Sequence, residues 1–178
     1  MAEAQAMAAP PVTEKNNRVL ALSVAGAIMV VDQLSKWIVI HPLQLRERQV
    51  IDLLPFFDLR WVENRGVSMG FLTANTDTTR WLLVAMTAAI ATGVLVWLWR
   101  ERVRADALAL AMVLGGALGN IIDRVRYGYV ADFLDLHIGE FRPFLIFNVA
   151  DAAISIGVLL LVVRALFVRE KKSPQEEV

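Results

Sequence analysis

Long apolar stretches separated by polar connections dominate this sequence, and their length decides the fold class. Four such runs occupy residues 19–40, 81–99, 107–122 and 145–163. Each is about 16–22 residues long, close to the roughly 20 residues that a helix needs to cross a bilayer. Lipid offers no hydrogen-bond partners to an open backbone, so a spanning run must be helical. The pattern therefore predicts an all-α membrane protein with four transmembrane helices.

The two longest connections, residues 41–80 and 124–144, carry a different pattern. Apolar and polar residues alternate over residues 57–61 and again over residues 134–138. Such alternation is typical of half-buried strands. We therefore expect these outer connections to form a small extracytoplasmic β-sheet at the membrane surface.

Basic side chains indicate the orientation, because lysine and arginine favour the cytoplasmic ends of spans. They gather before the first run, between the second and third, and after the fourth: Lys15, Arg18, Arg100, Arg102, Arg104, Arg169, Lys171 and Lys172. We therefore expect both termini in the cytoplasm and residues 41–80 and 124–144 outside it. Residues 1–17 are expected to be a disordered cytoplasmic head, 18–168 a single membrane domain, and 169–178 a cytoplasmic tail.

Composition narrows the possible functions. Hydrophobic residues make up 57% of the 178 residues, and 18 basic residues balance 18 acidic ones. A chain without net charge has no bulk attraction to nucleic acid, so we expect no nucleic-acid partner. The chain has no cysteine and only two histidines, which excludes thiolate chemistry and leaves no zinc-binding H-E-x-x-H motif. We expect neither a metal nor a cofactor.

Polar side chains at membrane depth are rare and usually functional, so their positions are informative. They gather near the predicted outer ends of three runs and just beyond the third: Asp32, Lys36, Asn120, Asp123, Arg124, Asp132, Asn148 and Asp151. Within each run the spacing is three or four residues, which places the polar groups on one helix face. The sequence therefore predicts a polar site at the outer leaflet.

Several of these residues also have a purely structural explanation. Asp32 and Lys36 can form a local ion pair, and Asp123 could pair with Arg124 at the end of a helix. The asparagines could join helices through hydrogen bonds, and the glycine-rich stretch 115–119 indicates close helix packing.

Asp132 and Asp151 are harder to explain as structural. Asp151 lies in the fourth run with no basic residue nearby in sequence, and Asp132 lies in an apolar stretch between Ala131 and Phe133. Close carboxylates cannot both ionise cheaply, so one keeps a proton. The ionised one can take a proton from water while the other donates to a carbonyl oxygen, which is peptide hydrolysis without a metal. The spacing does not decide whether Asp123 or Asp132 is the partner of Asp151.

Two other classes of function use the same kinds of residue. A small carrier or proton relay would move ions through intramembrane carboxylates, but it needs a polar path, and the inner halves of the last three runs are nearly apolar. A structural subunit would use the Asp and Asn side chains only to join helices. Replacing Asp132 with Asn separates these hypotheses, because a structural subunit tolerates that change and a peptidase does not.

Five short motifs in this chain match a known family in their order and spacing. They are DQLSK at 32–36, NRGVSMG at 64–70, GGALGNIIDR at 115–124, VADF at 130–133 and FNVAD at 147–151. With these motifs the chain resembles the lipoprotein signal peptidases, the type II signal peptidases of bacteria. The resemblance covers about residues 30–157. Met69 and Ala152 depart from the family pattern, which often has an aromatic residue and Ser or Thr there, and neither is a catalytic group.

The resemblance implies a metal-independent aspartyl endopeptidase that cuts prolipoproteins just before a diacylglyceryl-modified cysteine. It assigns catalysis to Asp132 and Asp151. It assigns substrate binding to four residues and support of the site to four others: Asn64, Asn120, Arg124 and Asn148 for binding, and Asp32, Lys36, Gly66 and Asp123 for support. It also implies a monomer in the bacterial inner membrane, with its active site at the outer face. The expected partners are lipid-modified prolipoproteins and membrane lipid.

Overall fold

The computed structural model describes residues 14–66 and 77–167. Its elements in chain order are α1 (Glu14–Ile40), α2 (Leu45–Arg48), β1 (Val50–Leu54), β2 (Phe57–Asn64), α3 (Asp77–Arg100), α4 (Arg104–Tyr127), β3 (Val130–Leu136) and α5 (Val149–Phe167). The predicted tail, the motif residues 67–70 and the first 13 residues of the predicted head lie outside the described residues. Residues 14–17, which the sequence assigned to that head, are helical and begin α1.

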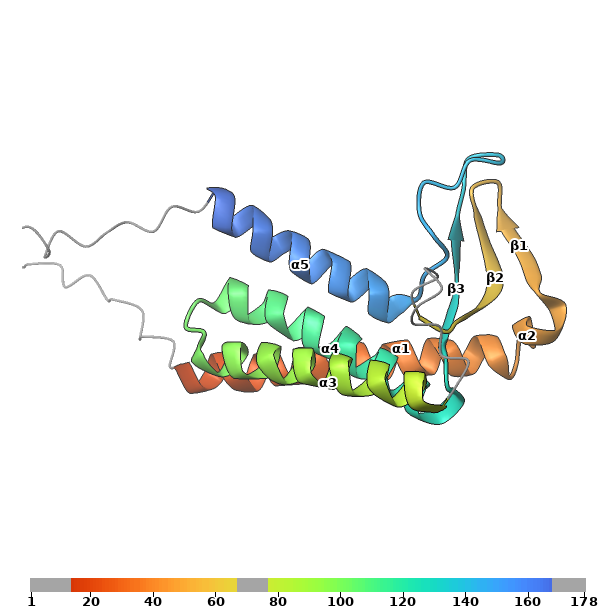
Figure 1. The fold of residues 1–178 in the computed structure, drawn as a ribbon. Coiled ribbons are helices and arrows are strands. Elements are labelled where there is room, and N and C mark those ends of the chain that lie inside the picture. Colours follow the sequence, from red (N-terminus) through yellow and green to blue (C-terminus); the bar gives the residue numbers. More distant parts are fainter. Residues whose placement is uncertain (1–13, 67–76, 168–178) are drawn as a thin grey trace, which may run out of the picture.

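Four helices, α1, α3, α4 and α5, are long and apolar enough to cross a membrane, which confirms the predicted spans. The first residues of α1, the last residues of α5 and the α3–α4 connection lie together at one end of the bundle. The sheet lies at the other end (Figure 1). α4 contacts each of the other three helices. Its most apolar stretch is 56% buried, against 17–22% in the others, so α4 forms the centre of the bundle.

Small residues let α4 approach its neighbours closely. A Cβ atom added at Gly115 would lie 2.5 Å from the backbone oxygen of Ala25 in α1. One added at Gly157 in α5 would lie 2.7 Å from the backbone oxygen of Ala109 in α4. Both distances are too short for a real side chain, so these contacts require glycine. The close packing predicted for the glycine-rich stretch of α4 is confirmed.

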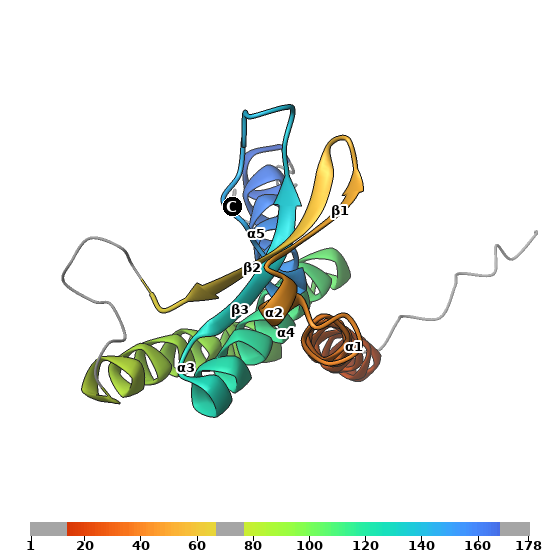
Figure 2. The ribbon, with the colours of Figure 1, turned by 90° about the vertical axis from the view of Figure 1, so that its right-hand side faces the viewer.

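Three antiparallel strands form a sheet in the order β1-β2-β3, and they run across the helix axes (Figures 1 and 2). β2 and β3 contain the two alternating stretches, which confirms the predicted strands. β3 ends at Leu136, however, and Ile138 lies beyond it in an isolated bridge with Phe141. A buried cluster that includes Val39 of α1 and Trp61 of β2 holds the sheet against this end of the bundle.

The fourth apolar run begins beside the sheet and not in a helix, which corrects the predicted span. α5 starts at Val149, and Leu145 before it is 91% exposed. Phe147 instead forms two backbone hydrogen bonds with Leu134 of β3, at 2.8 and 3.1 Å. An apolar run alone cannot separate a helix from an extended segment that pairs with a strand.

α3 and α4 are longer than their apolar runs. Residues 77–80 and 124–127, which the sequence assigned to the outer connections, are helical because polar residues can continue a helix beyond the lipid. α4 ends at Tyr127, and Gly128 after it has a φ of 82°, the left-handed conformation that suits glycine after a helix. The chain then enters β3 within two residues, which keeps the end of α4 close to the sheet.

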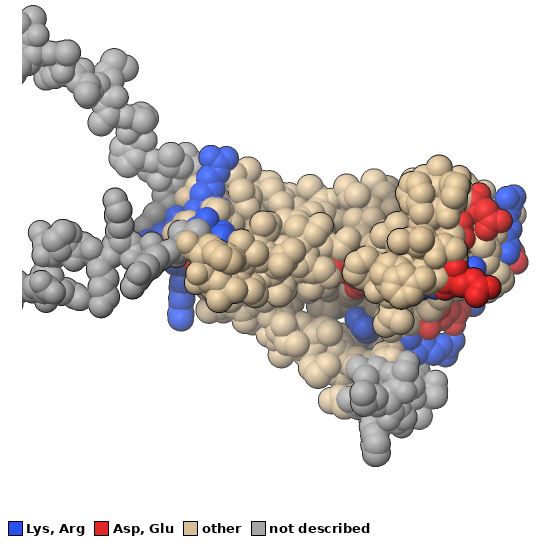
Figure 3. Space-filling model, turned by 90° about the horizontal axis from the view of Figure 1, so that it is seen from above, with Lys and Arg blue, Asp and Glu red and all other residues tan. Residues whose placement is uncertain are grey.

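Charged side chains gather at the two ends of the molecule, and a largely uncharged surface lies between them (Figure 3). Arg100, Arg102 and Arg104 lie around the α3–α4 connection, at the end opposite to the sheet. This distribution is typical of a protein whose middle faces lipid.

Candidate active site

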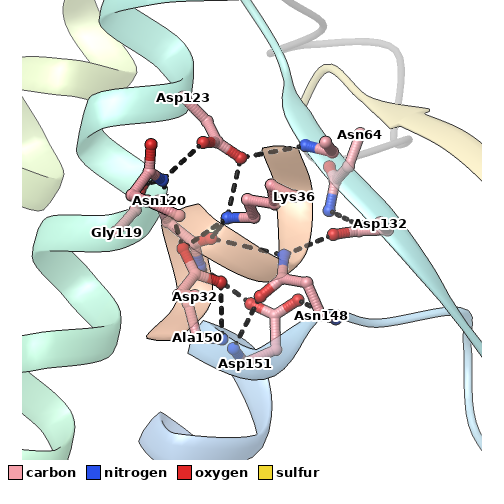
Figure 4. A network of polar contacts seen from close by, with 12 residues as sticks. Asp32, Lys36, Asn64, Gly119, Asn120, Asp123, Asp132, Asn148, Ala150 and Asp151 are labelled. Atoms are coloured by element: carbon pink, nitrogen blue, oxygen red, sulfur yellow. Dashed lines mark hydrogen bonds and ion pairs between the residues drawn. The ribbon is translucent and has the colours of Figure 1, made fainter. Parts of the chain in front are cut away.

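A network of polar side chains fills the junction between the helix bundle and the sheet (Figure 4). It contains eight residues that the sequence singled out: Asp32, Lys36, Asn64, Asn120, Asp123, Asp132, Asn148 and Asp151. Five of them are at most 2% exposed: Asp32, Lys36, Asp123, Asp132 and Asn148. Polar groups buried to this extent are stable only if they bond to one another.

Asn148 and Asp151 begin α5. The backbone N–H of Asp151 donates to Asn148 Oδ1 at 2.9 Å, and the backbone N–H of Asn148 donates to Asp151 Oδ2 at 3.3 Å. This reciprocal pair is a capping box, which explains why the helix starts at Val149. Asp151 therefore lies in the first turn, where the helix dipole favours negative charge.

Asp132 lies on β3 and is 2% exposed. Its Oδ1 accepts a hydrogen bond from Asn148 Nδ2 at 2.6 Å, and its Oδ2 accepts one from Asn64 Nδ2 at 3.0 Å. Burial, followed by the charge of Asp151, raises the pKa of Asp132 to about 7, against the opposing effect of these amides. The side-chain amide of Asn148 thus binds the carboxylate of Asp132 through its nitrogen and the backbone N–H of Asp151 through its oxygen.

Asn64 is the last residue of β2, and the turn after it sets its orientation. Its Oδ1 accepts a hydrogen bond from the backbone N–H of Gly66 at 3.1 Å. Gly66 has a φ of 109°, a conformation that residues with a side chain rarely adopt. Gly66 therefore directs the amide nitrogen of Asn64 towards Asp132.

Asn120 of α4 binds the carboxylate of Asp151 and the side-chain amide of Asn148. Its Nδ2 donates to Asp151 Oδ1 at 2.8 Å. Its Oδ1 accepts from Asn148 Nδ2 at 3.3 Å and from Lys36 Nζ at 3.4 Å. The hydrogen bond to Asn148 joins α4 and α5, so the predicted structural role of these two asparagines is present as well.

Lys36 lies between two carboxylates. Its Nζ is 2.8 Å from Asp32 Oδ2 and 2.7 Å from Asp123 Oδ2, and all three side chains are almost fully buried. The predicted pair of Asp32 with Lys36 is confirmed. The alternative pair of Asp123 with Arg124 is wrong, because adjacent residues of a helix point in different directions and Asp123 faces α1.

The same two carboxylates hold the backbone beside the two candidate catalytic residues. Asp32 Oδ1 accepts from the N–H of Ala150 at 3.0 Å, one residue before Asp151. Asp123 Oδ2 accepts from the N–H of Ala131 at 3.1 Å, one residue before Asp132. The ion cluster of Asp32, Lys36 and Asp123 therefore connects α1 and α4 to the start of α5 and to β3.

Gln33 belongs to this network, although the sequence reasoning gave it no role. Its Nε2 donates to Asp123 Oδ1 at 2.9 Å, to Asp32 Oδ2 at 3.2 Å and to the backbone oxygen of Gly119 at 3.2 Å. The signal that could have found it is an amide side chain inside an apolar run, directly after an aspartate.

Arg124 is half-buried beside the network, where its positive charge interacts with the carboxyl groups of Asp151 and Asp132. Within the described residues it forms no ion pair closer than 4 Å, so its guanidinium can bind a ligand. Its backbone oxygen accepts a hydrogen bond from Arg80 Nε at 2.8 Å. Arg80, which the sequence reasoning did not select, thereby ties the end of α4 to α3.

An apolar pocket of about 320 Å³ adjoins Asp151. α5 contributes Ala152 and Ile156 to its lining, and the segment before α5 contributes Phe144 and Phe147. Across the described parts of the chain, no three His, Asp or Glu side chains group as the ligands of a metal ion do.

Comparison with known proteins identifies relatives over most of the chain. The family model for signal peptidase (SPase) II matches residues 24–167. A lipoprotein signal peptidase of Rhizorhabdus wittichii is 62% identical over 162 residues, which are 91% of this chain and 94% of that protein. A lipoprotein signal peptidase of Sphingopyxis alaskensis is 58% identical over 83% of this chain and 85% of that protein.

The fold is also similar to that of solved structures. A bacterial membrane enzyme solved by the in meso method superposes with a TM-score of 0.72 at 25% identity, over 87% of this chain and 94% of that one. A second structure of this description gives a TM-score of 0.72 at 26% identity. The sequence matches and the shared fold together show that this chain belongs to the signal peptidase II family.

Proposed function

We propose that this chain is an aspartyl endopeptidase that removes the signal peptide from bacterial prolipoproteins, cutting before the diacylglyceryl-modified cysteine. The observation that carries the proposal is that Asn148 donates to both carboxylates, to Asp132 through its side-chain amide and to Asp151 through its backbone N–H. Two carboxylates held close together can share one proton. The name of the related proteins, lipoprotein signal peptidase, supplies the class of substrate.

Hydrolysis by such a pair needs no covalent intermediate. One carboxylate takes a proton from water while the water oxygen attacks the scissile carbonyl carbon, and the other carboxyl group gives its proton to the carbonyl oxygen. The resulting diol collapses, the C–N bond breaks, and the proton taken from water passes to the leaving nitrogen. We expect this reaction to need no metal, so cleavage should persist in the presence of a chelator.

The substrate backbone has partners close to these carboxylates. Asn64, Asn120 and Asn148 each donate to a candidate catalytic carboxylate, so a peptide bond placed there lies within reach of their amides. Arg124 adds a positive charge at the same place. We propose that these four residues bind the substrate. Asp32, Lys36, Asp123 and Gly66 then act indirectly, by holding these groups and the adjacent backbone.

The surroundings suit a substrate that lies in the membrane. The apolar pocket beside Asp151 can accept hydrocarbon, because its lining is almost entirely apolar. The network lies at the sheet end of the bundle, away from the basic residues of the α3–α4 connection (Figures 1 and 3). We therefore propose a monomer in the bacterial inner membrane, with cytoplasmic termini and the active site at the outer face.

The chain has no cysteine, so this orientation can be tested with single introduced cysteines. Gln49, Gly139 and Arg102 are all exposed. A membrane-impermeant thiol reagent added to intact cells should label Gln49→Cys and Gly139→Cys but not Arg102→Cys. Labelling of Arg102→Cys in intact cells would reverse the proposed orientation.

The catalytic proposal is tested by Asp132→Asn and Asp151→Asn, with Asp52→Asn at an exposed position of β1 as the matched control. Purified variants are incubated in detergent with a lipid-modified precursor and a chelator. Each of the first two variants should fold, bind the precursor and fail to cut it, whereas the control should cut normally. The double variant should be little worse than either single one, because the members of one catalytic unit are not additive. Cleavage by folded Asp132→Asn together with its loss in Asp123→Asn would move the catalytic role to Asp123.

A further inference from the structure

Four N–H groups point at the two candidate catalytic carboxylates. Asp132 accepts from the side-chain amides of Asn64 and Asn148. Asp151 accepts from the side-chain amide of Asn120 and from the backbone N–H of Asn148. Each carboxylate accepts two hydrogen bonds, so the number of hydrogen bonds alone does not distinguish them.

A hydrogen-bond donor at the oxygen of each asparagine amide fixes its orientation, so that the nitrogen and the oxygen cannot exchange places. The N–H of Gly66 binds Asn64, the N–H of Asp151 binds Asn148, and the ammonium group of Lys36 binds Asn120. An amide nitrogen can only donate. These nitrogens therefore accept no proton from either carboxyl group, and the proton of the pair stays on one of the two carboxyl groups.

The surroundings of the two carboxylates differ in kind. Asp151 lies in the first turn of α5, where aligned backbone N–H groups stabilise negative charge, and it is half-buried, so water reaches it. Its partner Asn120 is itself bound to the cation of Lys36. Asp132 lies on a strand, which has no such dipole, and is 2% exposed.

We propose that Asp132 holds the proton of the catalytic pair and that Asp151 is the ionised member; this assignment rests on the proposed function. The charged groups around the pair, among the described residues, are Asp32 and Lys36 of α1 and Asp123 and Arg124 of α4. The raised pKa of Asp132, about 7, agrees with this division, and burial is its largest cause.

The assignment gives each carboxylate one task. Asp151 removes a proton from water, whose oxygen attacks the carbonyl carbon, and Asp132 donates its proton to the carbonyl oxygen. When the C–N bond breaks, the proton on Asp151 moves to the leaving nitrogen. Asp132 recovers a proton from the collapsing diol, so the pair returns to its starting state.

The test is infrared difference spectroscopy of the purified, substrate-free enzyme in detergent, read at the carbonyl stretch of a protonated carboxylic acid between pH 5 and pH 8. The wild type should show such a band that disappears with a midpoint near pH 7. Asp132→Asn should lack this titrating band. Asp151→Asn should keep it with a lower midpoint, because the neighbouring charge is gone while burial remains. Asp52→Asn should match the wild type.

Retention of the wild-type band in Asp132→Asn and its loss in Asp151→Asn would reverse the assignment and overturn the proposal. So would a wild-type spectrum with no titrating carboxyl band, because both groups would then be ionised. The measurement needs no substrate, so it is independent of the proposed function. Normal cleavage by both Asn variants would sink the peptidase mechanism even if the band belonged to Asp132.

Discussion

Asn148 performs two tasks with the two ends of one amide, and a pair of substitutions should separate them. Its oxygen caps α5 by accepting the N–H of Asp151 at 2.9 Å, and its nitrogen donates to Asp132 at 2.6 Å. Asn148→Ser keeps an oxygen that can cap the helix but loses the amide nitrogen. Asn148→Ala loses both.

The magnitudes follow from these contacts. Loss of an N-cap typically costs about 1 kcal/mol, which lowers the Tm of a protein of this size by about 2–4 °C. A hydrogen bond to an uncharged carboxyl group, the state proposed for Asp132, contributes about 0.5–1.5 kcal/mol, which corresponds to about a 2- to 13-fold change in kcat/KM. Asn148→Ser should therefore keep most of the Tm and lose activity, whereas Asn148→Ala should lose both.

Thermal unfolding in detergent and cleavage of a lipid-modified precursor measure the two effects on the same samples. Asn17→Ser is the matched control, because Asn17 lies at the opposite end of the bundle and its amide binds the backbone oxygen of Arg102. Wild-type activity in Asn148→Ser would refute the importance of the contact to Asp132. An equal loss of Tm in Asn148→Ser and Asn148→Ala would refute the capping argument.

Three further predictions concern the groups around this asparagine. Lys36→Met should lower the free energy of unfolding by about 3–5 kcal/mol in denaturant titrations, because it leaves two buried carboxylates unpaired. Adding Asp123→Asn should restore part of this loss. Wild-type stability of Lys36→Met would mean that the ion cluster does not stabilise the fold. The pKa of Asp132 is raised in the folded state, so its contribution to stability is present below its unfolded pKa near 4 and is lost as the pH rises through about 7. The Tm should therefore fall between these pH values in the wild type and fall less in Asp132→Asn. Parallel Tm curves of the two proteins would contradict the raised pKa. Gly119→Ala should lower both the Tm and the cleavage rate, because the added Cβ would meet the carboxylate of Asp32. Gly26→Ala should leave both unchanged, because nothing lies within 4 Å of the added Cβ. Equal behaviour of the two variants would contradict the close packing at Gly119.

The limits of sequence reasoning are clearest at the helix ends. The fourth apolar run was expected to be helical from residue 145, but its third residue, Phe147, pairs with Leu134 of β3 instead. Hydrophobicity does not distinguish a membrane helix from an extended segment paired with a strand, because both contain runs of apolar side chains. The capping box of Asn148 and Asp151 is the local signal that marks the true start of α5 at Val149.

The amino-acid sequence by itself determined the membrane class, the four spans and the gathering of polar residues at one end of the bundle. It could do so because an apolar run of about 20 residues has only a helical solution in lipid, and because residue spacing defines a helix face. Only the tertiary structure decided which groups meet. Asp123 and Asp132 were equal candidates by spacing, but Asp123 turns to Lys36 across the α1–α4 interface, whereas Asp132 faces the asparagine that caps Asp151. Periodicity defines the face of an element, but the neighbour of that face depends on how the elements pack.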